Sequence, residues 1–188
     1  MKTIQGLKMK LSSILFLGCS LLFTTIVFAQ TNPDFERRMN SNLVGTYYQG
    51  EGLYSQAEYK KEQNDNNWKS MLELAEQRAK EILEGSSLLE GSPTVAEAHF
   101  LYGKCYLLDG KYAEAYPYFK RALEFDPKFL DKKKLKEQVL KYVFKLIKAS
   151  EKSNKEIALK ACDLFIDNDT DSHESRGEVD TLKKALEQ

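Results

Sequence analysis

Residues 94–129 constrain the fold of this chain more than any other stretch, because they read as two helices joined by a tight turn. In the first half, apolar and aromatic residues recur at steps of three and four, the spacing of one face of a helix. In the second half, Ala115, Phe119 and Ala122 place small, large and small side chains on one side, as close helix packing requires. The pattern therefore predicts a helical hairpin.

Glycine and proline mark the ends of these two helices. Gly110 is expected to end the first helix, because glycine enters the left-handed conformation without steric cost. Gly103 is expected to let a neighbouring backbone approach the first helix. Pro127 prevents the second helix from continuing, and Pro117 predicts a kink or a late start, since proline inside a helix costs about 3 kcal/mol. One hairpin cannot bury its own apolar face and must stack on others.

These positions resemble the tetratricopeptide repeat, a helical hairpin of about 34 residues with small and aromatic residues at fixed places. Tyr102 stands where the family has Leu, and His99 departs from the usual Trp. The resemblance implies an all-α fold of stacked antiparallel hairpins and a protein that binds a peptide or helix in a concave groove formed by the first helices. The residues that carry the resemblance are Gly103, Tyr106, Gly110, Tyr112, Ala115, Phe119, Ala122 and Pro127.

The remaining segments predict about three hairpins, an inserted helix and a C-terminal capping helix in a short superhelix. Gly45, Tyr48, Gly52, Tyr54 and Ala57 repeat the spacing found around Gly110, which predicts a degenerate first hairpin turning at Gly52. A polar break at residues 64–67 precedes the predicted inserted helix, residues 68–83. Residues 135–165 predict a third hairpin without the diagnostic glycines, and residues 178–186 a polar-faced cap.

Residues 1–29 have the features of an export signal: three lysines, a mostly apolar run over residues 11–28, and a small-residue cleavage site at Ala29. Cleavage there leaves a helical domain, residues 30–188, in the periplasm or cell envelope and no membrane span. Two alternatives remain open at this point: a lipid anchor at Cys19, or an uncleaved anchor.

The charge balance of the chain argues against one class of partner, nucleic acid. Removing the three signal lysines from 28 basic residues leaves 25 against 28 acidic ones, which disfavours nucleic acid because phosphate neutralisation needs a basic surplus.

The two cysteines beyond the signal segment are expected to be structural. An exported compartment permits a disulfide, but Cys105 and Cys162 both lie on predicted apolar faces. We therefore expect both residues to be buried free thiols.

The chain shows no catalytic constellation, so we expect a non-enzymatic protein without a cofactor. Its two histidines are far apart in sequence, and it has no nucleophile elbow, phosphate-binding glycine loop or paired-cysteine motif. One acidic segment, residues 167–178, resembles a calcium-binding loop in its ligand spacing. The oxygen ligands would be Asp167, Asp169, Asp171 and Glu178, although Ser172 replaces the usual turn glycine; a solvated linker is the alternative.

The candidate binding surface is the concave face of the clear repeat. Phe100, Lys104, Leu107 and Leu108 lie off the predicted packing face, so they either line the groove or are covered by the neighbouring hairpin. The lysine run of residues 132–145 either attracts an acidic partner or an anionic membrane surface, or forms a solvated face.

The sequence as a whole predicts an adaptor or scaffold that binds a protein or peptide partner. The alternatives are an envelope lipoprotein and a solute-binding accessory component of a transport or assembly system. A cavity lined by Tyr47, Tyr48 and Tyr106 would favour the solute-binding alternative.

Overall fold

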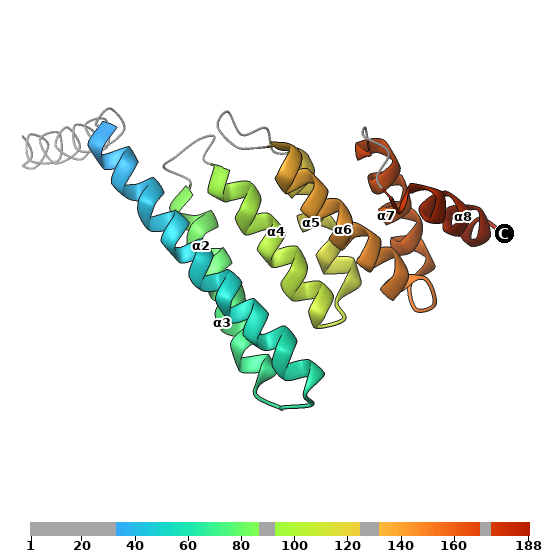
Figure 1. Cartoon of the computed structure of the whole chain (residues 1–188), viewed down its shortest axis with the longest axis horizontal. Helices are drawn as coiled ribbons and strands as arrows, with labels where there is room; N and C mark the ends of the chain where they lie inside the picture. The colour runs from blue at the N-terminus through green and yellow to red at the C-terminus, as the bar shows by residue number, and fades with distance from the viewer. Residues whose placement is uncertain (1–32, 87–92, 125–131, 170–173) are drawn as a thin grey trace, which may run out of the picture. The chain divides into compact units, whose positions relative to one another are not determined.

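The computed structural model describes residues 33–86, 93–124, 132–169 and 174–188, and their regular secondary structure is entirely helical (Figure 1). The all-α prediction is confirmed. The chain divides into two compact units, residues 1–41 and 42–188, and the contacts given below all lie within the second. The predicted signal segment, Cys19 and Pro127 lie outside the described residues. The helices are α2 (Pro33–Glu62), α3 (Trp68–Gly85), α4 (Pro93–Leu108), α5 (Tyr112–Glu124), α6 (Lys132–Ser150), α7 (Lys155–Asn168) and α8 (Arg176–Leu186).

The helices of residues 42–188 pack as three successive hairpins followed by α8. The α2 helix meets α3 at Gly50, where an added Cβ would lie 3.1 Å from the Cβ of Arg78. The α4 helix packs on α5, and α6 packs on α7. Neighbouring hairpins are joined by contacts of α3 with α4 and of α5 with α6, and α8 covers α7. The predicted stacking and the C-terminal cap are therefore confirmed.

The predicted turn at Gly52 is wrong, because α2 runs as one helix through Gly45, Gly50 and Gly52. The turn comes instead at Asn64, which has a φ of 58°. Residues 68–83 are therefore no insertion but belong to α3, the second helix of the first hairpin. Glycine weakens a helix by only about 1 kcal/mol relative to alanine, a cost that the packing of Gly50 against the side chain of Leu101 and α3 helps to offset.

The clear repeat forms as predicted. Gly110 lies in the turn between α4 and α5 and has a φ of 79°. The atoms close to Gly103 belong to the ring of Phe119, 2.5 Å from where a Cβ would stand, and not to a neighbouring backbone. The predicted late start at Pro117 is wrong, since α5 begins at Tyr112. Pro117 is exposed and is the sixth residue of α5, so the kink, which was the other expectation for this proline, stays a prediction.

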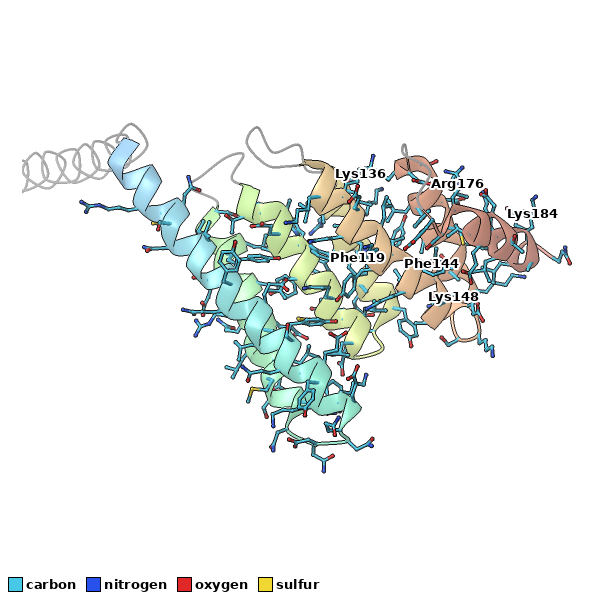
Figure 2. The ribbon with its side chains drawn as sticks, viewed as in Figure 1. Phe119, Lys136, Phe144, Lys148, Arg176 and Lys184 are labelled. Atoms are coloured by element: carbon cyan, nitrogen blue, oxygen red, sulfur yellow. The ribbon has the colours of Figure 1, made fainter. Side chains whose placement is uncertain are left out.

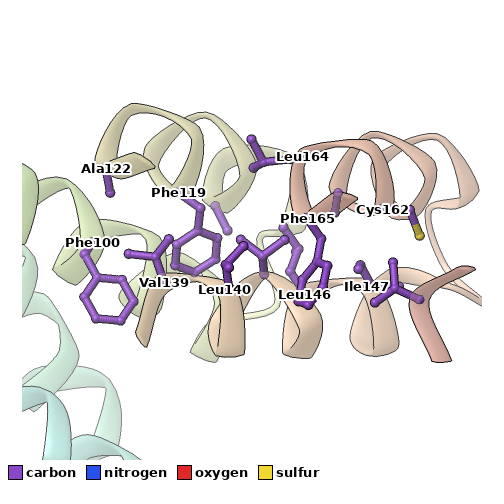
Figure 3. Packing of buried hydrophobic residues seen from close by; sticks show 14 of the residues in the cluster. Phe100, Phe119, Ala122, Val139, Leu140, Leu146, Ile147, Cys162, Leu164 and Phe165 are labelled. Carbon is purple, nitrogen blue, oxygen red and sulfur yellow. The ribbon is translucent and has the colours of Figure 1, made fainter. Parts of the chain in front are cut away.

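A continuous apolar core joins the last two hairpins and α8 (Figure 3). Phe119 and Phe165 are completely buried at its centre. Cys105 and Cys162 are both buried and free, as expected, and burial raises the pKa of the Cys162 thiol to about 11. Both thiols therefore behave as small apolar side chains.

Candidate functional site

The first helices of the three hairpins, α2, α4 and α6, bring charged and aromatic side chains together around Lys104. The Lys104 side chain is almost completely buried, at 4 % exposure. Its Nζ atom lies 2.5 Å from each carboxylate oxygen of Glu51. It also lies 4.5, 5.0 and 5.6 Å from the ring centroids of Tyr54, Phe100 and Tyr142. We call these five residues the Lys104 cluster.

Helical spacing explains how each helix contributes to the Lys104 cluster. Phe100 and Lys104 lie one turn apart on α4, and Glu51 and Tyr54 lie one turn apart on α2. The Tyr142 ring of α6 meets the Phe100 ring edge-on at 5.3 Å and the Tyr54 ring at 6.5 Å. The first and third hairpins therefore touch each other over the second.

Because of this contact, the residues predicted to line the groove are buried or half-buried. Phe100 is 3 % exposed, so Phe100 and Lys104 are covered by the neighbouring hairpins and do not line an open groove. Leu107 is half-buried against the apolar core. Leu108 is also half-buried, and its carbonyl oxygen accepts a hydrogen bond from Lys61 Nζ. The chain's own side chains occupy the centre of the inner face.

A second group of polar side chains adjoins the Lys104 cluster where α2 meets α4. The buried hydroxyl of Tyr47 donates a hydrogen bond to Glu51, and burial raises the pKa of Tyr47. Glu97 faces the same carboxylate from α4. Burial, with repulsion from Glu51 as the smaller cause, raises the pKa of Glu97 to about 7. Glu97 is therefore poised to lose its proton near neutral pH.

The raised pKa of Glu97 predicts a stability difference that depends on pH. The folded protein holds this proton up to about pH 7 and the unfolded chain releases it near pH 4.5, so the contribution of Glu97 to stability falls over that interval. We expect Glu97→Gln to match the wild type near pH 5 and to be more stable at pH 8, by on the order of 1 kcal/mol after discounting for solvent screening. Urea unfolding at both pH values measures this, and an equal stability difference at the two values would contradict it.

Several polar side chains at the margin of the Lys104 cluster remain accessible. Glu58 is half-buried and accepts a hydrogen bond from the Tyr54 hydroxyl at 3.3 Å. On the α6 side, Lys145 is exposed, with its Nζ atom 4.4 Å from the Tyr142 ring centroid. Lys141 is exposed one turn before it. Lys148, one turn further along α6, pairs with Glu178 of α8 at 2.6 Å (Figure 2).

Residues 96–129 match the family model of the tetratricopeptide repeat. This hairpin is a tetratricopeptide repeat. Its two helices are α4 and α5, so Phe100 and Lys104 belong to the first helix of the repeat. Tetratricopeptide repeats generally mediate protein–protein interactions, through the concave surface that their stacking creates. No curated protein and no solved structure matches the chain.

Within the four described ranges of the chain, none of the helices combines the length and the apolar composition needed to cross a membrane. The most apolar of the described helices, α4, still carries Glu97, Lys104 and His99.

The structure separates the predicted calcium ligands that it describes. Asp167 lies inside α7, and Glu178 lies in the first turn of α8 and pairs with Lys148. Asp169 follows α7, with its Oδ2 atom 3.7 Å from Nη1 of Arg176, and Asp171 lies outside the described residues. The described part of the chain brings no three His, Cys, Asp or Glu side chains together to hold a metal ion. Calcium binding by the loop stays a prediction.

The three tyrosines proposed for a solute cavity lie in different surroundings. Tyr47 is buried beside Glu51, whereas Tyr48 is 69 % exposed. Tyr106 stacks on Tyr118 within the tetratricopeptide repeat, with ring centroids 5.4 Å apart. The solute-binding alternative stays a prediction.

Sequence reasoning missed the importance of Glu51 and Tyr142. Glu51 is the single charged residue between Arg38 and Glu58. This isolation is a usable signal, because a lone charge in a long uncharged stretch of helix often has a buried partner. Tyr142 offered no such signal, since its position over α4 depends on how the third hairpin stacks on the second.

Proposed function

We propose that the protein is a non-enzymatic adaptor that binds a peptide or a helix of a partner protein along its inner face, in the cell envelope after export. One observation carries the proposal: the first helices of three successive hairpins bring aromatic and charged side chains together on one face. Because the Lys104 cluster fills the centre of this face, the partner binds at its α6 side.

Lys141, Tyr142 and Lys145 supply the accessible side chains on the α6 side of the inner face. Neither lysine makes an ion pair with another described residue; Lys145 instead lies over the ring of Tyr142. Their ammonium groups are free to meet carboxylates, and the half-buried ring of Tyr142 supplies an apolar contact at low entropic cost. This combination suits a partner segment with acidic side chains next to an apolar one.

Charge reversal tests the proposal. We expect a Lys141→Glu, Lys145→Glu variant to recover at least about tenfold less partner than the wild type in affinity capture from the native envelope, as expected when two favourable charge contacts become repulsive. The matched control is Lys155→Glu, Lys160→Glu on α7, which changes the net charge equally on a different helix and is expected to recover the partner as the wild type does. Equal recovery by both double variants would refute the assignment to the inner face.

The location of the protein is tested separately. The mass of the N-terminus of the protein isolated from its native envelope distinguishes cleavage after Ala29 from lipid attachment at Cys19 and from a retained segment. The first result supports a free exported adaptor, the second supports the lipoprotein alternative, and the third supports the uncleaved anchor.

A further inference from the structure

The outer face of α2, on the side away from α3 and α4, is not covered by any other described helix and carries large apolar side chains. Tyr48 is 69 % exposed and Tyr59 63 % exposed. Gly45 and Gly52 have no atom within 4 Å of where a Cβ would stand. Among the described residues, every exposed large apolar side chain belongs to the first hairpin; these are Val44, Tyr48, Tyr59 and Leu74. Together, Val44, Gly45, Tyr48, Gly52, Ser55 and Tyr59 are called the α2 outer face.

The α2 outer face also lacks charge over most of its length. The one charged residue between Arg38 and Glu58 is Glu51, whose carboxylate is paired with Lys104 on the inner side. In the whole chain, 30 % of residues are charged, so an exposed helix face of this length without charge is unusual. The centres of protein interfaces are depleted of charge and enriched in tyrosine, which indicates that another polypeptide covers this face.

The α2 outer face corresponds to the surface that joins hairpins within the stack. On α4, Ala98, Leu101 and Cys105 are fully buried, and the Leu101 side chain meets Gly50 of the preceding hairpin. Gly45, Tyr48 and Gly52 have the same spacing of three and then four residues on α2. The first hairpin therefore presents an unused copy of the stacking surface that buries α4.

We propose that a second copy of this chain covers the α2 outer face, with the two α2 helices antiparallel about a two-fold axis. A head-to-tail arrangement is disfavoured, because α8 covers the opposite end of the stack and exposes Glu178, Lys184 and Glu187. Among the described surfaces, two copies therefore pair their apolar faces best by using the same face twice, which is the geometry of a closed dimer.

The order of large and small residues on α2 fits this antiparallel pairing. In one register, the Tyr48 side chain of each copy lies opposite Gly52 of the other, and Gly45 lies opposite Ser55. Each large ring then meets a position without a bulky side chain, so the two helices approach closely. Residues 42–59 span about 27 Å of helix. Because a single pair of helices forms the whole contact, we expect a reversible dimer with a dissociation constant on the order of micromolar.

Sedimentation velocity on the purified protein, from about 1 to 200 µM, tests the proposal across the range of a micromolar dimer. We expect the mass to rise from monomer to dimer over this range. Gly52→Leu is expected to weaken the dimer at least about tenfold, because a leucine side chain blocks the close approach of the helices. The same change meets open space within the monomer and replaces glycine by a better helix former, so its melting temperature is expected not to fall.

Gly177→Leu is the matched control. Gly177 also has no atom within 4 Å of where a Cβ would stand, but it lies on α8, so this variant is expected to dimerise as the wild type does. Tyr48→Glu provides a second, independent disruption of the α2 outer face. A protein that stays monomeric at 200 µM overturns the proposal. A dimer that is insensitive to both Gly52→Leu and Tyr48→Glu also overturns it, and assigns self-association to another surface.

Discussion

A Phe119→Ala variant is expected to lose about 4 kcal/mol of its free energy of unfolding, the largest effect of any single truncation considered for this chain. The Phe119 ring is completely buried, and it contacts Gly103 and the rings of Phe100 and Tyr142. Its removal leaves a cavity where the second and third hairpins meet (Figure 3). Urea unfolding followed by helical circular dichroism measures the loss.

The pair formed by Gly103 and Phe119 supplies the control. Gly103→Ala alone is expected to destabilise the protein by about 1–3 kcal/mol, because the new methyl group would overlap the ring. Combined with Phe119→Leu, which gives the methyl group room, the two changes are expected to cost less than the sum of their separate effects. Strict additivity, or a loss of less than about 1 kcal/mol for Phe119→Ala, would contradict this account of the packing.

Lys104→Ala is expected to destabilise the protein by about 3 kcal/mol, because it removes the buried partner of the Glu51 carboxylate. The variant also loses the contacts of the lysine with three aromatic rings. A Lys104→Met, Glu51→Gln double variant keeps the volume and removes both charges, so it is expected to recover most of the loss. The same urea titration measures all of these variants.

Lys80→Ala is the matched control for Lys104→Ala. Its ammonium group lies 3.7 Å from Glu84, and both side chains are more than half exposed, so the change is expected to cost less than about 0.5 kcal/mol. Equal losses for Lys80→Ala and Lys104→Ala would show that the ion pair with Glu51 has no special energetic role.

Local pattern was sufficient to predict the tetratricopeptide repeat but failed at the first hairpin. In the repeat, Gly110 adopts a positive φ, and Ala115, Phe119 and Ala122 are buried. At each of these positions the residue type fits both the local backbone conformation and the packing of the side chain. In α2, the spacing of Gly45 and Gly52 imitated a turn. The backbone conformation of those glycines instead follows from the packing of the whole helix against its neighbours.

The candidate site was predicted only in part. Phe100 and Lys104 were predicted either to line the groove or to be covered by the neighbouring hairpin, and the structure buries both of them. Their burial depends on Tyr54 and Tyr142, residues 50 positions before and 38 positions after Lys104 in the chain. No local pattern relates residues at such separations.

The sequence by itself determined that the chain is helical, that residues 96–129 form a tetratricopeptide repeat, and that its apolar face must be covered, since period, small residues and turn glycines are local properties. Only the tertiary structure decided that α2 is one helix, that the inner face closes around Lys104, and that no other described helix covers the α2 outer face. The reason is physical: burial depends on which hairpin stacks on which, and stacking is a sum of contacts between residues far apart in the chain.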